Sequence, residues 1–96
     1  MDYKPRFLST FRADLAEILE YYVRFSQRYA QQLLNDVEKS AEVAAEFPEM
    51  AKRYKSYRVK IIKKRFLAFY KVNRAQKTVD FYRLIDGRRD YDKTVK

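Results

Sequence analysis

The apolar residues of the chain change their period near Pro48, and this change constrains the fold more than any other feature. Before Pro48 they recur every three or four positions, which is typical of the buried face of an amphipathic helix. Two such stripes are present: Phe11, Leu15, Ile18, Leu19 and Tyr22, then Ala30, Leu33, Leu34, Val37, Ala41 and Ala44. Thr10 is a candidate N-cap for the first helix, and the second begins after Ser26. It ends before Pro48, because proline disfavours helix in the preceding residue. We expect an antiparallel helical hairpin.

After Pro48 the apolar residues alternate with polar ones, as in half-buried β-strands. We expect strands at residues 57–63, 66–72 and 78–85, joined by short polar turns into an antiparallel meander. Residues 3–9 form a further expected strand, with Pro5 confining it to an edge. The sequence thus predicts one α+β domain spanning residues 1–96. In this β-α-α-β-β-β arrangement the N-terminal helical hairpin packs on a twisted antiparallel sheet.

The residues that the chain lacks exclude several kinds of chemical site, and its lack of long apolar stretches excludes secretion and membrane insertion. The 96 residues contain no cysteine and no histidine, so we expect no disulfide, no imidazole base, no transition metal and no cofactor. The first nine residues lack the apolar core of a signal peptide, and no stretch approaches the length of a membrane span. We therefore expect a soluble, cytoplasmic protein without membrane contacts.

Charge is distributed very unevenly along the chain. Residues 1–49 contain six Lys or Arg and nine Asp or Glu, a net charge of −3, whereas residues 50–96 contain sixteen and four, a net charge of +12. Residues 50–79 carry eleven basic side chains and no acidic one. A solubilising surface normally mixes both signs, so this excess indicates an anionic partner. We expect strand alternation to gather the following side chains on one outward cationic surface: Arg58, Lys60, Lys63, Lys64, Arg65, Arg83, Arg88 and Arg89.

Arg83 is unusual within this set. By alternation it shares an apolar face with Val79, Phe81 and Ile85, where a charged group needs a partner or a functional role. An ion pair with Asp86, Asp90 or a helix carboxylate such as Glu17 explains Arg83 as well as a functional surface does.

Gly87 is the only glycine in the chain and follows the last expected strand. We expect it to adopt a positive φ angle at a sharp turn that directs Arg88, Arg89 and Tyr91 back across the sheet.

Four ordered stretches resemble the RelE/ParE superfamily of bacterial toxins from toxin–antitoxin modules. They read "ADLAEILEYY", "SQRYAQQLLNDVEKS", "YRVKIIKKRFLAFYKVN" and "VDFYRLIDGRRDY", and together they span residues 13–91. The resemblance implies a growth-inhibiting toxin of a type II toxin–antitoxin system that a cognate antitoxin holds inactive. ParE-like members often have a histidine before the glycine, where this chain has Asp86, so histidine-dependent chemistry is excluded.

The resemblance implies two alternative activities. A ParE-like toxin poisons DNA gyrase by binding and is not a hydrolytic enzyme; the "DGRRDY" ending favours this branch slightly. A RelE-like toxin is a metal-independent endoribonuclease that cleaves mRNA on the ribosome. It would need a base, a cation to stabilise the phosphorane and an acid. The candidates for that chemistry are Lys60, Lys63, Arg65, Arg83, Arg88 and Tyr91.

The expected partners follow from these alternatives. For target binding the candidates are the eight basic residues of the expected surface together with Tyr91. The expected antitoxin is an acidic, partly apolar segment that neutralises the basic half. A non-toxic basic RNA-binding domain remains a third hypothesis; it explains the charge, but not the four ordered matches.

Overall fold

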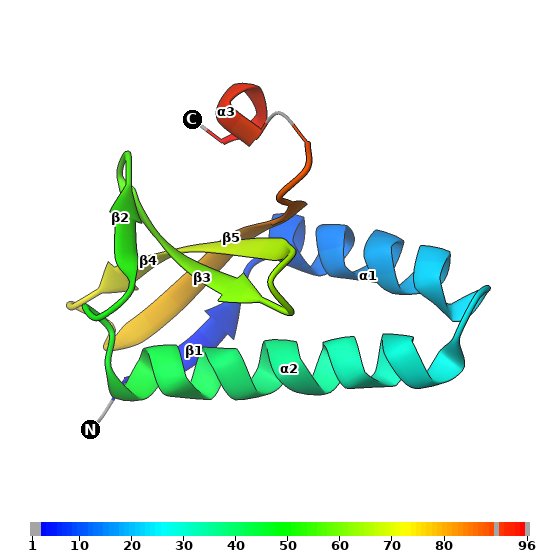
Figure 1. The fold of residues 1–96 in the computed structure, drawn as a ribbon. Helices are drawn as coiled ribbons and strands as arrows, with labels where there is room; N and C mark the ends of the chain where they lie inside the picture. Colours follow the sequence, from blue (N-terminus) through cyan, green and yellow to red (C-terminus); the bar gives the residue numbers. More distant parts are fainter. Residues whose placement is uncertain (1–2, 90, 96) are drawn as a thin grey trace.

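The helical hairpin and the sheet are both present in the computed structural model, which describes residues 3–89 and 91–95. The elements in chain order are β1 (Lys4–Phe7), α1 (Ser9–Val23), α2 (Gln27–Glu46), β2 (Lys52–Tyr54), β3 (Tyr57–Ile62), β4 (Phe66–Asn73), β5 (Thr78–Asp86) and α3 (Tyr91–Thr94). The antiparallel pair α1 and α2 covers one face of the sheet (Figure 1). This confirms the predicted α+β class. No helix in these ranges is long and apolar enough to cross a membrane.

The sheet has five strands in the order β1-β5-β4-β3-β2. Strands β3, β4 and β5 form the predicted antiparallel meander, and the short strand β2 extends it beyond β3. The prediction of a wholly antiparallel sheet is wrong, because β1 pairs with β5 in parallel. Strand alternation gives the two faces of a strand but not the edge at which a distant strand is added, so sequence reasoning missed this pairing.

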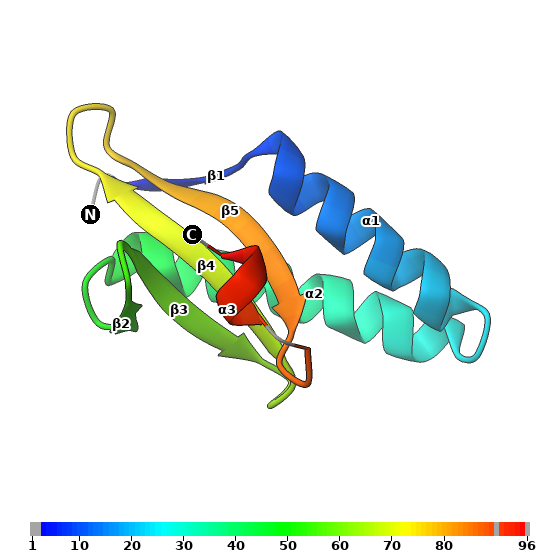
Figure 2. The ribbon, with the colours of Figure 1, turned by 90° about the horizontal axis from the view of Figure 1, so that it is seen from above.

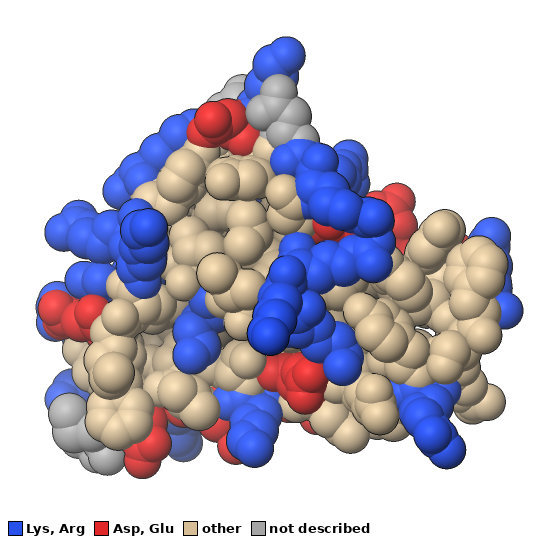
Figure 3. All heavy atoms as spheres, in the orientation of Figure 1, with Lys and Arg blue, Asp and Glu red and all other residues tan. Residues whose placement is uncertain are grey.

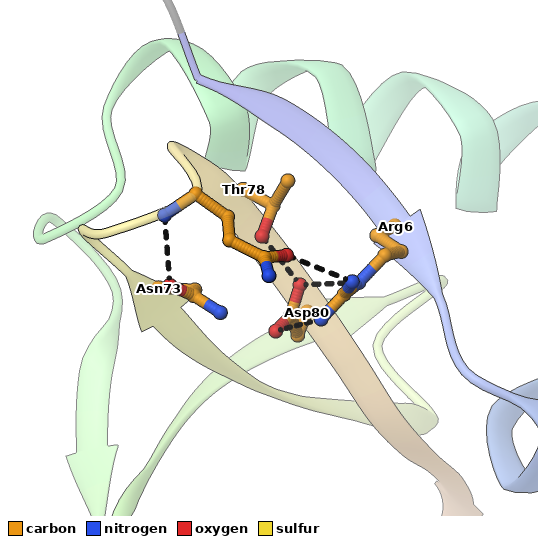
Figure 4. Close-up of polar contacts among 5 residues, drawn as sticks. Arg6, Asn73, Thr78 and Asp80 are labelled. Carbon is orange, nitrogen blue, oxygen red and sulfur yellow. Dashed lines mark hydrogen bonds and ion pairs between the residues drawn. The ribbon is translucent and has the colours of Figure 1, made fainter.

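An ion pair between the buried Asp80 and the partly exposed Arg6 holds β1 beside β5. Arg6 lies opposite Asp80 and donates two hydrogen bonds to its carboxylate, at 3.0 and 2.8 Å (Figure 4). The Thr78 hydroxyl donates a third hydrogen bond to Asp80 at 2.7 Å. Burial raises the pKa of Asp80, but the hydrogen bonds from Arg6 and Thr78 outweigh burial and hold this pKa below its ordinary value. The strand predicted within residues 3–9 is thus confirmed as an edge strand, β1, anchored to β5.

The helix boundaries agree closely with the apolar stripes. Helix α2 begins after Ser26, as predicted, and the Ser26 side chain caps it by accepting a hydrogen bond from the Tyr29 amide. Thr10 is not the cap of α1, because the helix begins at Ser9 and Leu8 occupies the N-cap position. The Thr10 hydroxyl donates instead to the Tyr82 carbonyl oxygen at 2.6 Å, which joins α1 to β5.

Two apolar clusters lie on opposite faces of the sheet. The inner cluster fills the space between helices and sheet; its largest members are Phe11, Leu33, Phe66, Tyr70, Phe81 and Leu84. The outer cluster consists of Phe69, Ile85 and Val95, with partly buried tyrosines around them. Helix α3 lies across this outer face (Figure 2). Val95 is only 1% exposed there, so the end of the chain covers apolar surface that the helical hairpin does not reach.

Candidate functional site

The turn between β3 and β4 contacts the segment that follows β5, and Gly87 makes this contact possible. The Gly87 amide donates a hydrogen bond to the Arg65 carbonyl oxygen, with 2.6 Å between N and O. A Cβ atom on Gly87 would lie 2.8 Å from the same oxygen. The prediction of a positive φ angle at Gly87 is wrong. The position requires glycine for close approach of two backbones and not for a left-handed conformation.

Lysines, not glycines, occupy the left-handed backbone conformation in this turn. Lys63 and Lys64 have φ angles of 54° and 56°. Such angles are unfavourable for residues with a Cβ atom and persist only where the surrounding structure enforces them. Here the enforcing contacts are the pairing of β3 with β4 and the hydrogen bond from Gly87 to Arg65. The strained turn presents cationic side chains at the end of the sheet.

A hollow of about 480 Å³ opens beside this turn, and we call it the turn hollow. It is lined by Ile61, Lys64, Arg65, Leu67, Gly87, Arg88 and Tyr91. Lys and Arg side chains gather over this end of the sheet in the space-filling view (Figure 3). The structure therefore brings four of the predicted site residues together: Lys64, Arg65, Arg88 and Tyr91.

Asp86 organises two of these cations. It accepts a hydrogen bond from Arg65 Nε at 3.2 Å, and from Arg88 it accepts bonds from the backbone amide at 3.0 Å and from the guanidinium at 3.2 and 3.3 Å. Partial burial lowers the pKa of Arg65, but hydrogen bonds to Asp86 and to Tyr22 outweigh burial and raise it. The Arg65 guanidinium also lies over the Tyr22 ring, 5.4 Å from its centroid. Arg65 is thus held in place, whereas the Arg88 side chain is 72% exposed.

Arg83 lies away from the turn hollow, at the edge of the sheet covered by α1. The register between β4 and β5 shifts: Tyr70 lies opposite Phe81 and Phe69 opposite Arg83, so Tyr82 is an extra residue. The extra residue puts Arg83 on the opposite face from Val79 and Phe81, so the prediction that they share a face is wrong. Arg83 and Ile85 still share a face, because the shift lies before both of them. The ion-pair partner of Arg83 is Asp14, which is none of the three acids suggested from the sequence, and Asp90 lies outside the described residues.

The Arg83 guanidinium donates to both carboxylate oxygens of Asp14, at 2.7 and 3.1 Å. The same carboxylate accepts a hydrogen bond from the Leu84 amide at 2.9 Å. The hydrogen bond to Asp14 raises the pKa of Arg83 above its ordinary value, and partial burial opposes this only in part. Sequence reasoning missed Asp14, because nothing in a helical pattern marks which polar residue meets a strand edge.

The basic residues of β3, and Lys63 of the turn that follows it, lie on the side of the sheet that faces α2. Arg58 donates to the Ala51 carbonyl oxygen at 2.8 Å, and Lys63 lies 3.5 Å from the Asp36 carboxylate of α2. Lys60 lines hollows beside α2. Tyr57 and Val59 pack instead against the outer cluster. The alternation of β3 was predicted correctly, but the basic face points toward the helices and not outward.

The predicted single cationic surface is therefore wrong. The structure places Arg58, Lys60 and Lys63 beside α2, Arg83 at α1, and Lys64, Arg65, Arg88 and Tyr91 at the turn hollow. The Arg89 side chain is exposed in the segment after β5. Within the described ranges, no group of three or more Asp or Glu side chains could hold a metal ion.

Comparisons with known proteins identify related chains. Residues 6–91 match the model of a family described as ParE toxin of type II toxin-antitoxin system, parDE. No curated protein matches the sequence. A chain in the structure of the chromosomal ParDE toxin–antitoxin system from P. aeruginosa superposes with a TM-score of 0.74 at 18% identity, covering 88% of this chain and 96% of that one. A chain in the toxin–antitoxin complex RelBE2 from Mycobacterium tuberculosis gives 0.61 at 17% identity, covering 90% and 99%.

Proposed function

The chain belongs to the ParE toxin family of type II toxin–antitoxin systems, and from this premise we propose that it inhibits growth by binding DNA gyrase, until a cognate antitoxin neutralises it. It acts in this proposal as a binding protein and not as a nuclease. The resemblance in sequence suggested two branches with different targets, and the family match favours the ParE-like branch.

The separation of the six residues that an mRNA endoribonuclease would use is the observation that carries this proposal. Lys60 and Lys63 lie beside α2, and Lys63 is paired with Asp36. The Arg83 guanidinium is occupied by Asp14. RNA cleavage needs a base, a cation and an acid around one phosphate, within hydrogen-bonding distance of the reacting atoms. This arrangement supports binding more than it supports cleavage.

We assign the gyrase contact to the turn hollow. Arg88 supplies an exposed guanidinium, and Lys64 and Tyr91 line the same hollow. An exposed cation beside apolar side chains such as Ile61 and Leu67 suits an acidic protein surface with apolar residues. The strained turn and the bond between Gly87 and Arg65 keep these groups in a fixed arrangement, which lowers the entropic cost of docking.

Supercoiling by purified gyrase tests the proposal. We expect the wild-type chain to inhibit the reaction and the double variant Lys64→Ala and Arg88→Ala to lose at least tenfold in potency. Arg24→Ala is the matched control, since Arg24 is an exposed arginine at the C-terminal end of α1 and does not line the turn hollow. Undisturbed supercoiling with the wild-type chain would contradict the proposal.

Translation extracts test the endoribonuclease alternative, and growth after induction tests the RNA-binding alternative. Cleavage of ribosome-bound mRNA by the wild-type chain, lost in an Arg83→Ala and Arg88→Ala variant, would indicate a RelE-like endoribonuclease. If induction of the chain leaves growth unchanged, the non-toxic RNA-binding hypothesis is favoured.

A further inference from the structure

The tip of the helical hairpin carries exposed apolar side chains. The hairpin extends beyond the sheet in both ribbon views, so its tip points away from the rest of the molecule (Figures 1 and 2). Phe25 is 71% exposed, Tyr21 54% and Val23 47%. We call these three residues the apolar tip. Exposed apolar side chains that gather in one place mark an interaction surface.

The apolar tip has a fixed conformation. The Phe25 ring packs against the Tyr21 ring, with 5.2 Å between the ring centroids. The Tyr22 carbonyl oxygen accepts hydrogen bonds from the amides of Phe25 and Ser26, at 3.0 and 2.9 Å, and Ser26 also caps α2. Because these rings are held in place before any partner binds, docking through them loses little conformational entropy.

A hollow in the same hairpin suits an apolar side chain of this kind. It has a volume of about 380 Å³ and lies between α1 and α2, directly behind the tip. We call it the hairpin hollow. Its lining comes from the two helices alone: Ala16, Leu19, Glu20, Val23, Gln27, Ala30, Gln31 and Leu34. A projecting ring and an apolar hollow on one surface are the two halves of a self-complementary contact, because each copy in a two-fold dimer supplies both.

Charge along the hairpin is self-complementary as well. Residues 13–20 contain three acids and no base, whereas residues 21–34 contain two bases and no acid. The exposed members of these two groups form no ion pair within residues 3–89 and 91–95; they are Glu17, Glu20, Arg24 and Arg28. When two hairpins lie antiparallel, the basic tip of each copy lies over the acidic part of α1 in the other.

The net charge of the chain makes the hairpin the favourable place for contact between copies. The whole chain carries +9, so two copies repel one another. Residues 9–46, which form the hairpin, contain seven acidic and four basic residues, a net charge of −3. Contact through the hairpins keeps the two cationic sheets at opposite ends of the pair, where salt screens their repulsion most.

We propose that two copies of this chain associate through their hairpins as a two-fold dimer, in which Phe25 of each copy enters the hairpin hollow of the other. Arg24 then pairs with Glu20 of the second copy. These two residues are four positions apart on α1, about 6 Å along the helix, which matches the shift that brings a tip over the opposite hollow. The dimer leaves both turn hollows exposed, so the inference does not depend on gyrase as the target.

Sedimentation velocity of the purified full chain tests the dimer. We expect a monomer–dimer equilibrium that shifts with concentration. Phe25→Glu should raise the dimer Kd at least tenfold, because a carboxylate that enters the hollow loses its hydration. Met50→Glu is the matched control, since Met50 is an apolar residue that is 78% exposed outside the hairpin, and its Kd should equal that of the wild type. A chain that stays monomeric at every concentration, or equal effects of the two variants, would overturn the proposal.

Charge reversal tests the pairing of Arg24 with Glu20. Glu20→Arg and Arg24→Glu should each raise the dimer Kd at least tenfold, because each homodimer then brings like charges together. A mixture of the two variants is expected to form a heterodimer with a Kd within about threefold of the wild-type value, since both pairs are again of opposite sign. A pair within one helix cannot produce this recovery on mixing. A mixture that stays monomeric would contradict the proposed pairing.

The absence of cysteine from the chain allows the two-fold axis to be located by a disulfide. Gln27 lines the end of the hairpin hollow nearest the tip, so it lies close to the axis and to its own counterpart. Gln27→Cys should form a disulfide-linked dimer under mild oxidation, because cysteines with Cα atoms within about 7 Å can be bridged. Ser56→Cys, exposed in the loop between β2 and β3, is the control and should stay monomeric on a non-reducing gel. Equal crosslinking at both positions, or at Ser56 alone, would place the contact elsewhere and overturn the proposal.

Discussion

Asp14 on α1 binds Arg83 on β5 through both carboxylate oxygens, at 2.7 and 3.1 Å, and also accepts a hydrogen bond from the Leu84 amide at 2.9 Å. Strand β1 pairs with β5 only as far as Phe81, so the rest of this edge would otherwise be open. A single helix carboxylate thus satisfies a strand amide and a guanidinium and ties the helical hairpin to the sheet.

Asp14→Ala is expected to lower the free energy of unfolding by about 1–3 kcal/mol, because it leaves a partly buried guanidinium and a strand amide without their acceptor. Urea denaturation measures the change. Asp92→Ala is the control: Asp92 is exposed and lies 3.8 Å from Lys55, so this variant should change stability by less than about 0.5 kcal/mol. Similar stabilities for the two variants would contradict the role of Asp14.

Gly87→Ala should destabilise the chain by about 1–3 kcal/mol, because its Cβ atom would meet the Arg65 carbonyl oxygen at 2.8 Å. The same variant should speed hydrogen exchange of the residue 87 amide, as the bond to Arg65 lengthens. A variant as stable as the wild type, with unchanged exchange, would mean that the two backbones separate without cost.

Lys64→Gly is expected to raise the free energy of unfolding by about 0.5–1 kcal/mol, because glycine adopts a φ of 56° without a Cβ penalty, and this gain exceeds its greater loss of backbone entropy. Thermal or urea denaturation measures the effect. Lys60→Gly provides the opposite control, since Lys60 lies within an extended strand. There glycine should destabilise by about 0.5–1 kcal/mol.

The Arg6–Asp80 pair predicts how stability depends on pH. The folded-state pKa of Asp80 lies below its ordinary value near 3.8, so the pair stabilises the fold above that pH. The stabilisation is lost as the pH falls from 3.8 through the lower folded-state pKa, where Asp80 becomes protonated. In Asp80→Asn the stability at neutral pH should be lower and the decline below pH 3.8 shallower. Parallel pH profiles of the two proteins would assign the acid sensitivity to other carboxylates.

The local elements could be predicted from the sequence because each is encoded in neighbouring residues. The apolar spacing from Phe11 to Tyr22 matches one helix face, Ser26 caps the next helix, and Pro48 limits its end. Alternation in β3 separated Tyr57 and Val59 from Arg58 and Lys60 correctly. Hydrophobic period and capping chemistry act over a few residues, so they are readable without a structure.

The candidate site depended on contacts between residues far apart in the chain. Alternation does not tell which face of β3 the helices cover, and the extra residue at Tyr82 shifts Arg83 to the opposite face from Val79 and Phe81. The partner of Arg83 lies 69 residues away in Asp14, and Gly87 is required by a carbonyl group of Arg65.

The sequence by itself determined the helices, the meander and the basic character of the second half. Only the tertiary structure decided the edge that β1 joins, the division of the basic residues among three places, and the hollow between α1 and α2. The physical reason is that periodicity reports whether a side chain is buried, whereas ion-pair partners and open strand edges depend on how distant segments pack.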